Sequence, residues 1–216
     1  MQVVMQEKWH TYWKNPGDSG MPPSINVILP DGFKAGEIQW PVPSRFSSGG
    51  EVTFGYQNEV LFLREISIPT NLQIRTPVSL KANISILLCE ETCVPVQVSL
   101  EIILPVTDSV PQVDTRWEKL FAKNRKELPD STSTWRFQAR PMDERRIQIE
   151  ITPPPQAVFP ATMYFFPDQS SVVQINAPQI LQSGGGGHGP SLIVERGFAD
   201  PGPILSGVLV APVDWK

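Results

Sequence analysis

The sequence is poor in histidine and cysteine and has no long apolar run. Only two histidines and two cysteines occur among its 216 residues. A general base therefore has almost no candidate, and the chain has no nucleophile elbow, no phosphate-cradling glycine loop and no paired-histidine motif. No segment approaches the roughly 18–20 apolar residues of a membrane span. The sequence thus gives no support to classical hydrolase chemistry or to a transmembrane helix.

An excess of positive charge is also missing. The formal net charge of -4 provides no electrostatic case for binding nucleic acid or an anionic membrane. Residues 1–6 lack both the basic start and the apolar core of a signal peptide. Two closely spaced cysteines suit either an extracytoplasmic disulfide or a cytosolic redox pair, so they leave the compartment open. We expect the sequence to be an excised or processed piece of a longer protein.

Proline and glycine, in contrast, are abundant, with 23 and 15 residues. They favour many short strands and turns over helices, and a hydrophobic content of 40% suffices for buried cores. We interpret the chain as an all-β protein with two immunoglobulin-like antiparallel β-sandwich domains. Apolar segments between turn residues predict strands at 7–14, 24–29, 33–40, 51–56, 59–68, 78–88, 94–104, 135–139, 146–152, 162–166, 172–175, 192–195 and 204–210.

One helix is predicted between the two sets of strands. Residues 114–127 begin with the N-cap candidate Asp114 and place Trp117 and Leu120 on one apolar face. We expect this short amphipathic helix to join the two domains and its basic face to be solvated. The predicted organisation is a redox domain at 1–107, a helical linker at 108–133 and a second β-sandwich without cysteine at 134–216.

Both cysteines lie between two long alternating runs. The apolar residues at even positions from 78 to 88 share one face, and those from 94 to 104 share it on the return strand. With residues 90–92 as the loop, Cys89 and Cys93 lie directly across from each other, exposed on the face away from the core. Cross-strand Cα atoms lie roughly 4.5–5.5 Å apart, inside the disulfide range of about 4.4–6.8 Å. The pair can therefore bridge.

We interpret this pair as a dithiol/disulfide that exchanges electrons with other proteins. Exchange needs an accessible sulfur and a nearby leaving thiol, and a hairpin tip supplies both. A bridge across so small a loop contributes little stability in the chain-entropy model, which argues against a passive structural disulfide but leaves that alternative open. Because the neighbouring Glu90 and Glu91 raise a thiol's pKa, we expect thiols that react slowly without a partner's help.

Two other kinds of site are less well supported. Cys89 and Cys93 with His10 and His188 would supply four metal ligands, but their spacing matches no zinc pattern. We therefore predict neither a metal nor a cofactor. An aromatic groove for carbohydrate or peptide is the other possibility, although packing in the core and at edges is the preferred interpretation for most of its candidates. These candidates are Trp9, Tyr12, Trp13, Trp40, Phe54 and Tyr56.

Four blocks of the sequence point to a family. They are residues 9–22 (WHTYWKNPGDSGMP), 38–43 (IQWPVP), 54–56 (FGY) and 88–95 (LCEETCVP). Together they resemble the periplasmic N-terminal domain of DsbD-type thiol:disulfide interchange proteins, with the ScsB-like transmembrane reductases as the nearest subgroup. The similarity spans about residues 8–106, and residues 135–215 resemble the second β-domain of ScsB-like proteins. The three-residue gap between the cysteines departs from the longer gap of the best-known DsbD domains, which affects loop geometry and partner choice.

The resemblance implies an immunoglobulin-like periplasmic domain, the soluble part of an inner-membrane protein. Its electrons would come through the membrane domain from the cytoplasm, with the thioredoxin-like C-terminal domain of the same reductase as donor. The acceptors would be thioredoxin-fold disulfide oxidoreductases or isomerases of the periplasm. Cys89 and Cys93 are carried over as the redox pair. In the family an aromatic cap loop shields the disulfide until a partner docks, and Phe54 or Tyr56 matches that loop here, with Trp13 as a further shielding candidate.

The predicted function is therefore that of a protein-disulfide reductase domain. A partner thiolate attacks one sulfur and forms a mixed disulfide that the other cysteine resolves, and the reduced form then attacks a downstream disulfide. We favour Cys93 as the attacked sulfur, because Cys89 adjoins the acidic Glu90 whereas an uncharged threonine precedes Cys93. The alternative is a non-catalytic extracytoplasmic binding or scaffold module with a structural disulfide.

Overall fold

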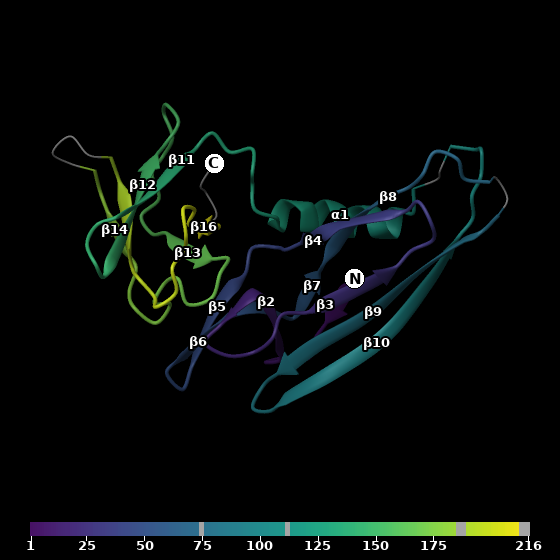
Figure 1. The fold of residues 1–216 in the computed structure, drawn as a ribbon, viewed down its shortest axis with the longest axis horizontal. Helices are drawn as coiled ribbons and strands as arrows, with labels where there is room; N and C mark the ends of the chain where they lie inside the picture. The colour runs from purple at the N-terminus through teal and green to yellow at the C-terminus, as the bar shows by residue number, and fades with distance from the viewer. Residues whose placement is uncertain (74–75, 111–112, 185–188, 212–216) are drawn as a thin grey trace. The chain divides into compact units, whose positions relative to one another are not determined.

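The computed structural model describes residues 1–73, 76–110, 113–184 and 189–211 and is shown in Figure 1. With 48% strand and 6% helix, the protein has the predicted all-β class. None of its helices within these ranges is long and apolar enough to cross a membrane. In chain order the elements are β1 (Gln2–Val4), β2 (His10–Gly17), β3 (Ser24–Ile28), β4 (Lys34–Gln39), β5 (Ser44–Ser48), β6 (Glu51–Gln57), β7 (Glu59–Leu61), β8 (Leu63–Ser67), β9 (Val78–Cys89), β10 (Cys93–Leu104), α1 (Thr115–Glu127), β11 (Arg136–Pro141), β12 (Arg146–Thr152), β13 (Tyr164–Pro167), β14 (Ile180–Gln182), β15 (Ser191–Glu195) and β16 (Gly207–Val210).

The chain forms two compact units. Unit 1 consists of Met1–Lys14, Gly20–Ser44 and Gly55–Pro129, and unit 2 consists of Asn15–Ser19, Arg45–Phe54 and Asp130–Lys216. Two short segments from the first half of the chain thus belong to unit 2, and strands β2, β5 and β6 each contribute residues to both units. Whether the segments 1–107 and 134–216 behave as separate folding domains stays a prediction.

In unit 1 the cysteine hairpin occupies one edge of a sheet. The strand order is β10-β9-β2-β6-β5, and β3 also pairs with β9. Strand β10 has β9 as its neighbour, whereas β9 has β10 on one side and both β2 and β3 on the other. Strands β9 and β10 pair over their full length, from Cys89 opposite Cys93 to Val78 opposite Leu104. The predicted hairpin and its register are confirmed.

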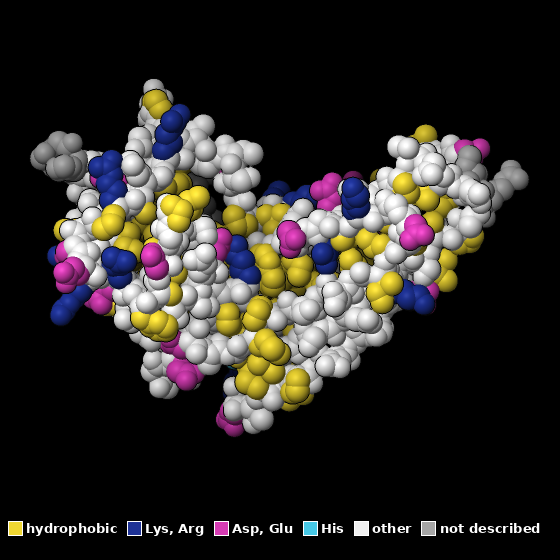
Figure 2. Space-filling model, viewed as in Figure 1, with side chains coloured by type: hydrophobic (Ala, Val, Ile, Leu, Met, Phe, Trp, Pro, Cys, Tyr) yellow, Lys and Arg dark blue, Asp and Glu magenta, His cyan; other side chains and the backbone are white. Residues whose placement is uncertain are grey.

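The two strands of this hairpin differ in how far their apolar face is covered. On β9, Ile84 and Ile86 are buried, each with 6% of its surface exposed. The prediction that the matching row of β10 faces the core is wrong. Because β10 lies at the sheet edge, this row remains substantially exposed at Val94, Val98, Leu100, Ile102 and Leu104. Figure 2 shows hydrophobic side chains at the surface beside the hairpin turn.

The predicted helix is confirmed as α1 and belongs to unit 1. The carboxylate of Asp114 accepts a hydrogen bond from the Arg116 backbone N–H, as expected of an N-cap. At the other end, the Glu127 carbonyl accepts a hydrogen bond from the Val42 N–H at 2.8 Å. The helix is therefore tied to the loop that follows β4 within the same unit.

Unit 2 is built on a four-stranded antiparallel sheet of order β11-β12-β15-β14 and the pair β13-β16. The strand predicted at 172–175 is absent, since Val173 forms only an isolated bridge with Arg196. Val172 and Val173 are buried by packing rather than by pairing in a ladder, so their apolar character was misleading. The buried core of this unit consists of Trp135, Ile147, Ile149, Ile151, Met163, Phe165, Val172, Val173, Leu192 and Val194.

Candidate functional site

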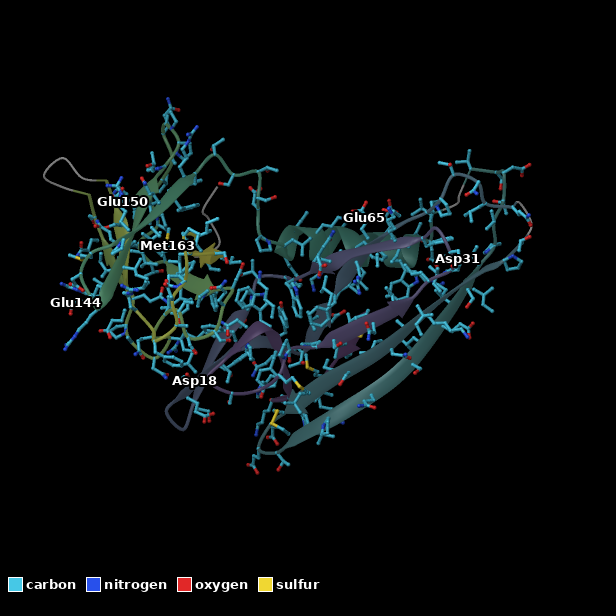
Figure 3. The ribbon with its side chains drawn as sticks, viewed as in Figure 1. Asp18, Asp31, Glu65, Glu144, Glu150 and Met163 are labelled. Atoms are coloured by element: carbon cyan, nitrogen blue, oxygen red, sulfur yellow. A yellow bond between two sulfur atoms is a disulfide. The ribbon has the colours of Figure 1, made fainter. Side chains whose placement is uncertain are left out.

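The two cysteines form a disulfide at the turn of the β9–β10 hairpin. Cys89 ends β9, Cys93 begins β10, and their Cα atoms lie 4.1 Å apart. The loop between them is closed by a hydrogen bond from the Glu90 N–H to the Thr92 carbonyl at 3.3 Å. Figure 3 shows the disulfide as a yellow bond at this turn. The bridge that the spacing allows is therefore formed.

The two sulfurs have unequal access to solvent. Cys93 is exposed, but only 2% of Cys89 is accessible. The predicted exposure is thus wrong for Cys89, because β2 pairs with the end of β9 and places His10 opposite Cys89. Paired residues share a face of the sheet, and so do residues two apart along a strand. His10 and Tyr12 therefore lie on the same face of the sheet as the disulfide.

Tyr12 is in contact with the outer sulfur. Its hydroxyl lies 3.9 Å from Cys93 Sγ, while only 3% of the residue is exposed. Because a disulfide sulfur carries no hydrogen, the Tyr12 hydroxyl is the donor in this contact. The ring of His10 packs edge-on against that of Tyr12, with centroids 5.3 Å apart. The site thus contains two polar aromatic side chains beside the sulfurs.

Strand β2 is fixed from several directions, which sets the position of these two side chains. The buried Thr11 donates a hydrogen bond from Oγ1 to the Leu87 carbonyl of β9 at 3.0 Å. At Gly55 of β6, any side chain would overlap the Thr11 carbonyl. Gly20, at φ +97°, lies against the Tyr12 ring and leaves no room for a Cβ. The phenol therefore has little freedom to move away from the sulfur.

His10 contributes a neutral imidazole near neutral pH. Burial lowers the pKa of His10 below its ordinary value, and a backbone hydrogen bond with Lys8 raises it in part. The sequence grouped His10 with the cysteines only as a possible metal ligand, and it is the pairing of β2 with β9 that places His10 opposite Cys89. The sequence feature that could have pointed to His10 and Tyr12 is that both lie in block 9–22, one of the four blocks that resemble the family.

The three predicted shielding residues are packed within their own units. Trp13 is fully buried in unit 1, on the face of β2 opposite to Tyr12. Tyr56, also in unit 1, donates a hydrogen bond from its hydroxyl to the Pro41 carbonyl at 2.8 Å. Phe54 belongs to unit 2, where its ring lies 5.0 Å from that of Phe166. Shielding of the disulfide by these residues stays a prediction.

The metal-site and aromatic-groove hypotheses can also be compared with the structure. Over the described ranges, no three His, Cys, Asp or Glu side chains gather as a potential metal site. His188, named in the metal hypothesis, lies outside the described residues. Of the aromatic groove candidates, Tyr12, Trp13, Phe54 and Tyr56 are buried, and Trp9 and Trp40 are half-buried. Their burial favours packing over an open groove.

Comparison with known proteins bears on both the first half and the whole chain. Residues 1–105 match the family described as "Thiol:disulfide interchange protein DsbD, N-terminal". The whole chain resembles the crystal structure of the N-terminal periplasmic domain of ScsB from Proteus mirabilis, with a TM-score of 0.71. The two chains are 19% identical, and the match covers 98% of this chain and 81% of the other. No curated protein sequence matches the chain.

The family match includes both cysteines, and the structural match extends over unit 2 as well. At this level of identity, the structural likeness to ScsB establishes the fold. The family match and the Cys89–Cys93 disulfide together support a thiol:disulfide interchange domain. The chain is therefore of DsbD N-terminal type over residues 1–105, which supports a thiol:disulfide interchange function for this region, and it has an ScsB-like fold.

Proposed function

We propose that this protein relays electrons between thioredoxin-fold proteins in the periplasm, with Cys93 as the sulfur that partners attack. The observation that carries the proposal is the unequal access of the two sulfurs. A partner's thiolate must approach the sulfur along the line of the S–S bond. Cys93 is open to such an approach, whereas Cys89 is 2% exposed and pairs with His10 of β2.

The exchange then proceeds in two steps. The donor's thiolate attacks Cys93 Sγ, so that the S–S bond breaks and Cys89 leaves as a thiolate that takes a proton from water. The donor's second thiolate next attacks the donor's first sulfur, which is bonded to Cys93 in the mixed disulfide, and releases Cys93 as a thiolate. The donor is now oxidised by two electrons and this domain is reduced. The Cys93 thiolate finally attacks the disulfide of an acceptor, and Cys89 resolves the product.

The partners follow from the family. A DsbD-type domain works in thiol-disulfide relays, which supports a thioredoxin-like C-terminal domain of the same reductase as donor and a periplasmic oxidoreductase or isomerase as acceptor. The ScsB domain with the similar fold is periplasmic by its description, which supports the same compartment here. We further propose that both β-domains are immunoglobulin-like sandwiches and that the segment around α1 joins them.

Trapping of a mixed disulfide tests the proposal. The variants Cys89→Ser and Cys93→Ser are each mixed with the thioredoxin-like C-terminal domain of a DsbD-type reductase. In that domain the resolving cysteine is replaced by serine and the other is activated as a thionitrobenzoate mixed disulfide. We expect Cys89→Ser to form the complex about tenfold or more faster than Cys93→Ser, because its remaining sulfur is the exposed one. Equal rates for both variants would overturn the assignment of Cys93.

The alternative of a structural disulfide in a binding or scaffold module is tested by the midpoint potential. Structural bridges in secreted proteins have potentials below about -300 mV, whereas exchanging pairs lie higher. Thiol alkylation followed by mass spectrometry, across a series of glutathione and dithiothreitol redox buffers, measures this value. A midpoint below that limit, together with no trapping by either variant, would contradict the exchange function.

A further inference from the structure

We propose that the Tyr12 hydroxyl is the hydrogen-bond donor that stabilises Cys93 as a thiolate in the reduced protein. This inference deepens the proposed function and rests on it for its role in exchange. The starting point is the 3.9 Å contact between the Tyr12 hydroxyl and Cys93 Sγ. In the disulfide this contact is weak, since the sulfur is neutral. A thiolate at the same position accepts a charge-assisted hydrogen bond, which is shorter and stronger.

The surroundings of Tyr12 keep its hydroxyl at the sulfur in both redox states. The residue is 3% exposed, and Gly20 leaves no room on one side of its ring. The neighbouring Thr11 is bonded to the Leu87 carbonyl, so the backbone of β2 is tied to the strand that carries Cys89. His10 packs against the ring edge-on. A donor held in place in this way loses little conformational entropy when the thiolate forms.

The charged and titratable groups around the cysteines otherwise disfavour a thiolate. Glu90 and Glu91 lie in the exposed loop between them, and their carboxylates repel a second negative charge. On β2, His10 is neutral near pH 7, because burial lowers its pKa. Tyr12 thus supplies a donor beside two carboxylates that disfavour the thiolate and an imidazole that is neutral. Its hydrogen bond offsets part of the repulsion by the acidic loop.

Two steps of the exchange gain from this hydrogen bond. When the donor's second thiolate resolves the mixed disulfide, Cys93 is the leaving group, and a stabilised thiolate leaves faster. When the reduced domain meets an acceptor, the thiolate of Cys93 is the nucleophile, and a larger thiolate fraction raises the rate. Neither step requires Tyr12 to lose its proton. The phenol remains a donor throughout.

The test is a thiolate titration in single-cysteine backgrounds, where the two thiols cannot couple. The thiolate absorbance of reduced Cys89→Ser is followed against pH with and without Tyr12→Phe, which removes only the hydroxyl oxygen. A charge-assisted hydrogen bond corresponds to a shift of about one pH unit, so we expect about tenfold less Cys93 thiolate at pH 7 in the double variant. The same pair in the Cys93→Ser background reports on Cys89, whose titration we expect Tyr12→Phe to leave unchanged.

A matched control is Tyr164→Phe, which removes a phenol hydroxyl that donates to the Ile175 carbonyl within unit 2. We expect it to leave the Cys93 titration unchanged. An unchanged Cys93 titration in Tyr12→Phe would overturn the inference, as would an equal shift of Cys89, which would indicate a general loosening of the site. Thermal unfolding of each variant in the same buffer identifies any loss of folding. If Tyr12→Phe unfolds, Tyr12→Met, which removes the hydroxyl and is no larger than the phenol, takes its place.

This titration needs no partner, so it can fail while the exchange reaction succeeds. If Cys89→Ser traps the thioredoxin-like domain but Tyr12→Phe leaves the Cys93 titration unchanged, the proposed function is supported and the role of Tyr12 is refuted. If the Cys93 titration shifts as expected but neither cysteine variant traps the partner, the hydrogen bond is supported and the electron relay is refuted.

Discussion

Strands β9 and β10 have the same length and the same alternating pattern, but they experience different environments. Ile84 on β9 is 6% exposed, whereas Ile102, in the corresponding row of β10, is 55% exposed. The difference comes from neighbours: β2 and β3 flank β9, while β10 ends the sheet. The cysteines at the two strand ends repeat this contrast, with Cys89 buried and Cys93 exposed. Alternation thus predicts which face a side chain lies on, but not whether that face is covered.

The strongest expression of this contrast is the reactivity of the two thiols. In the folded, reduced single-cysteine variants, we expect a bulky maleimide to modify Cys93 about tenfold or more faster than Cys89, because Cys89 must await local opening of β2. Mass spectrometry of quenched samples measures the two rates. In denaturant the rates should converge. A faster reaction of Cys89 in the folded protein would contradict the burial on which the comparison rests.

The next largest effect concerns stability. Ile84→Ala and Ile102→Ala remove the same atoms from the same face of adjacent strands. We expect Ile84→Ala to lower the free energy of unfolding by about 2–4 kcal/mol, because it leaves a cavity in the core. The cost of Ile102→Ala should stay below about 1 kcal/mol, since its side chain is largely hydrated. Denaturant titration of both variants measures the difference, and equal losses would show that the β10 face is covered in solution.

Hydrogen bonds to β9 from its two sides provide a smaller test. Thr11→Val removes the bond to the Leu87 carbonyl in a buried position, and we expect a loss of about 1–2 kcal/mol. Ser99→Ala removes a bond from β10, Ser99 Oγ to Asn83 Oδ1, at an exposed position. There water replaces the lost partner, so the change should stay within about 0.5 kcal/mol. Urea unfolding compares the two variants, and a larger effect of Ser99→Ala would reverse the order.

The smallest effect is the pH dependence from His10. Burial lowers the pKa of His10 in the folded state below the ordinary histidine pKa of about 6.5. As the pH falls below about 6.5, the unfolded chain therefore binds more protons at His10 than the folded chain does. The stability contribution of neutral His10 is therefore fully present above that pH and is lost as the pH falls through the folded pKa. We expect His10→Gln to reduce the slope of unfolding free energy against pH between about pH 7 and pH 5. An unchanged slope would indicate that His10 titrates alike in both states.

The sequence by itself determined the local features of this protein. Strict alternation around a three-residue loop set the register of β9 and β10 and placed Cys89 opposite Cys93, because the period of a strand leaves no other pairing for so short a loop. The helix at α1 followed from its N-cap and apolar spacing. The all-β class followed from many short runs between turn residues.

Tertiary structure decided what covers each element. The pairing of β2 with β9 buried Cys89 and brought His10 and Tyr12 to the disulfide, although these residues lie far from the cysteines in the sequence. The same kind of long-range packing assigned Asn15–Ser19 and Arg45–Phe54 to unit 2. A local pattern encodes periodicity, but burial depends on neighbours from distant segments. For that reason the sequence predicted the disulfide itself, and only the folded structure separated its exposed sulfur from its buried one.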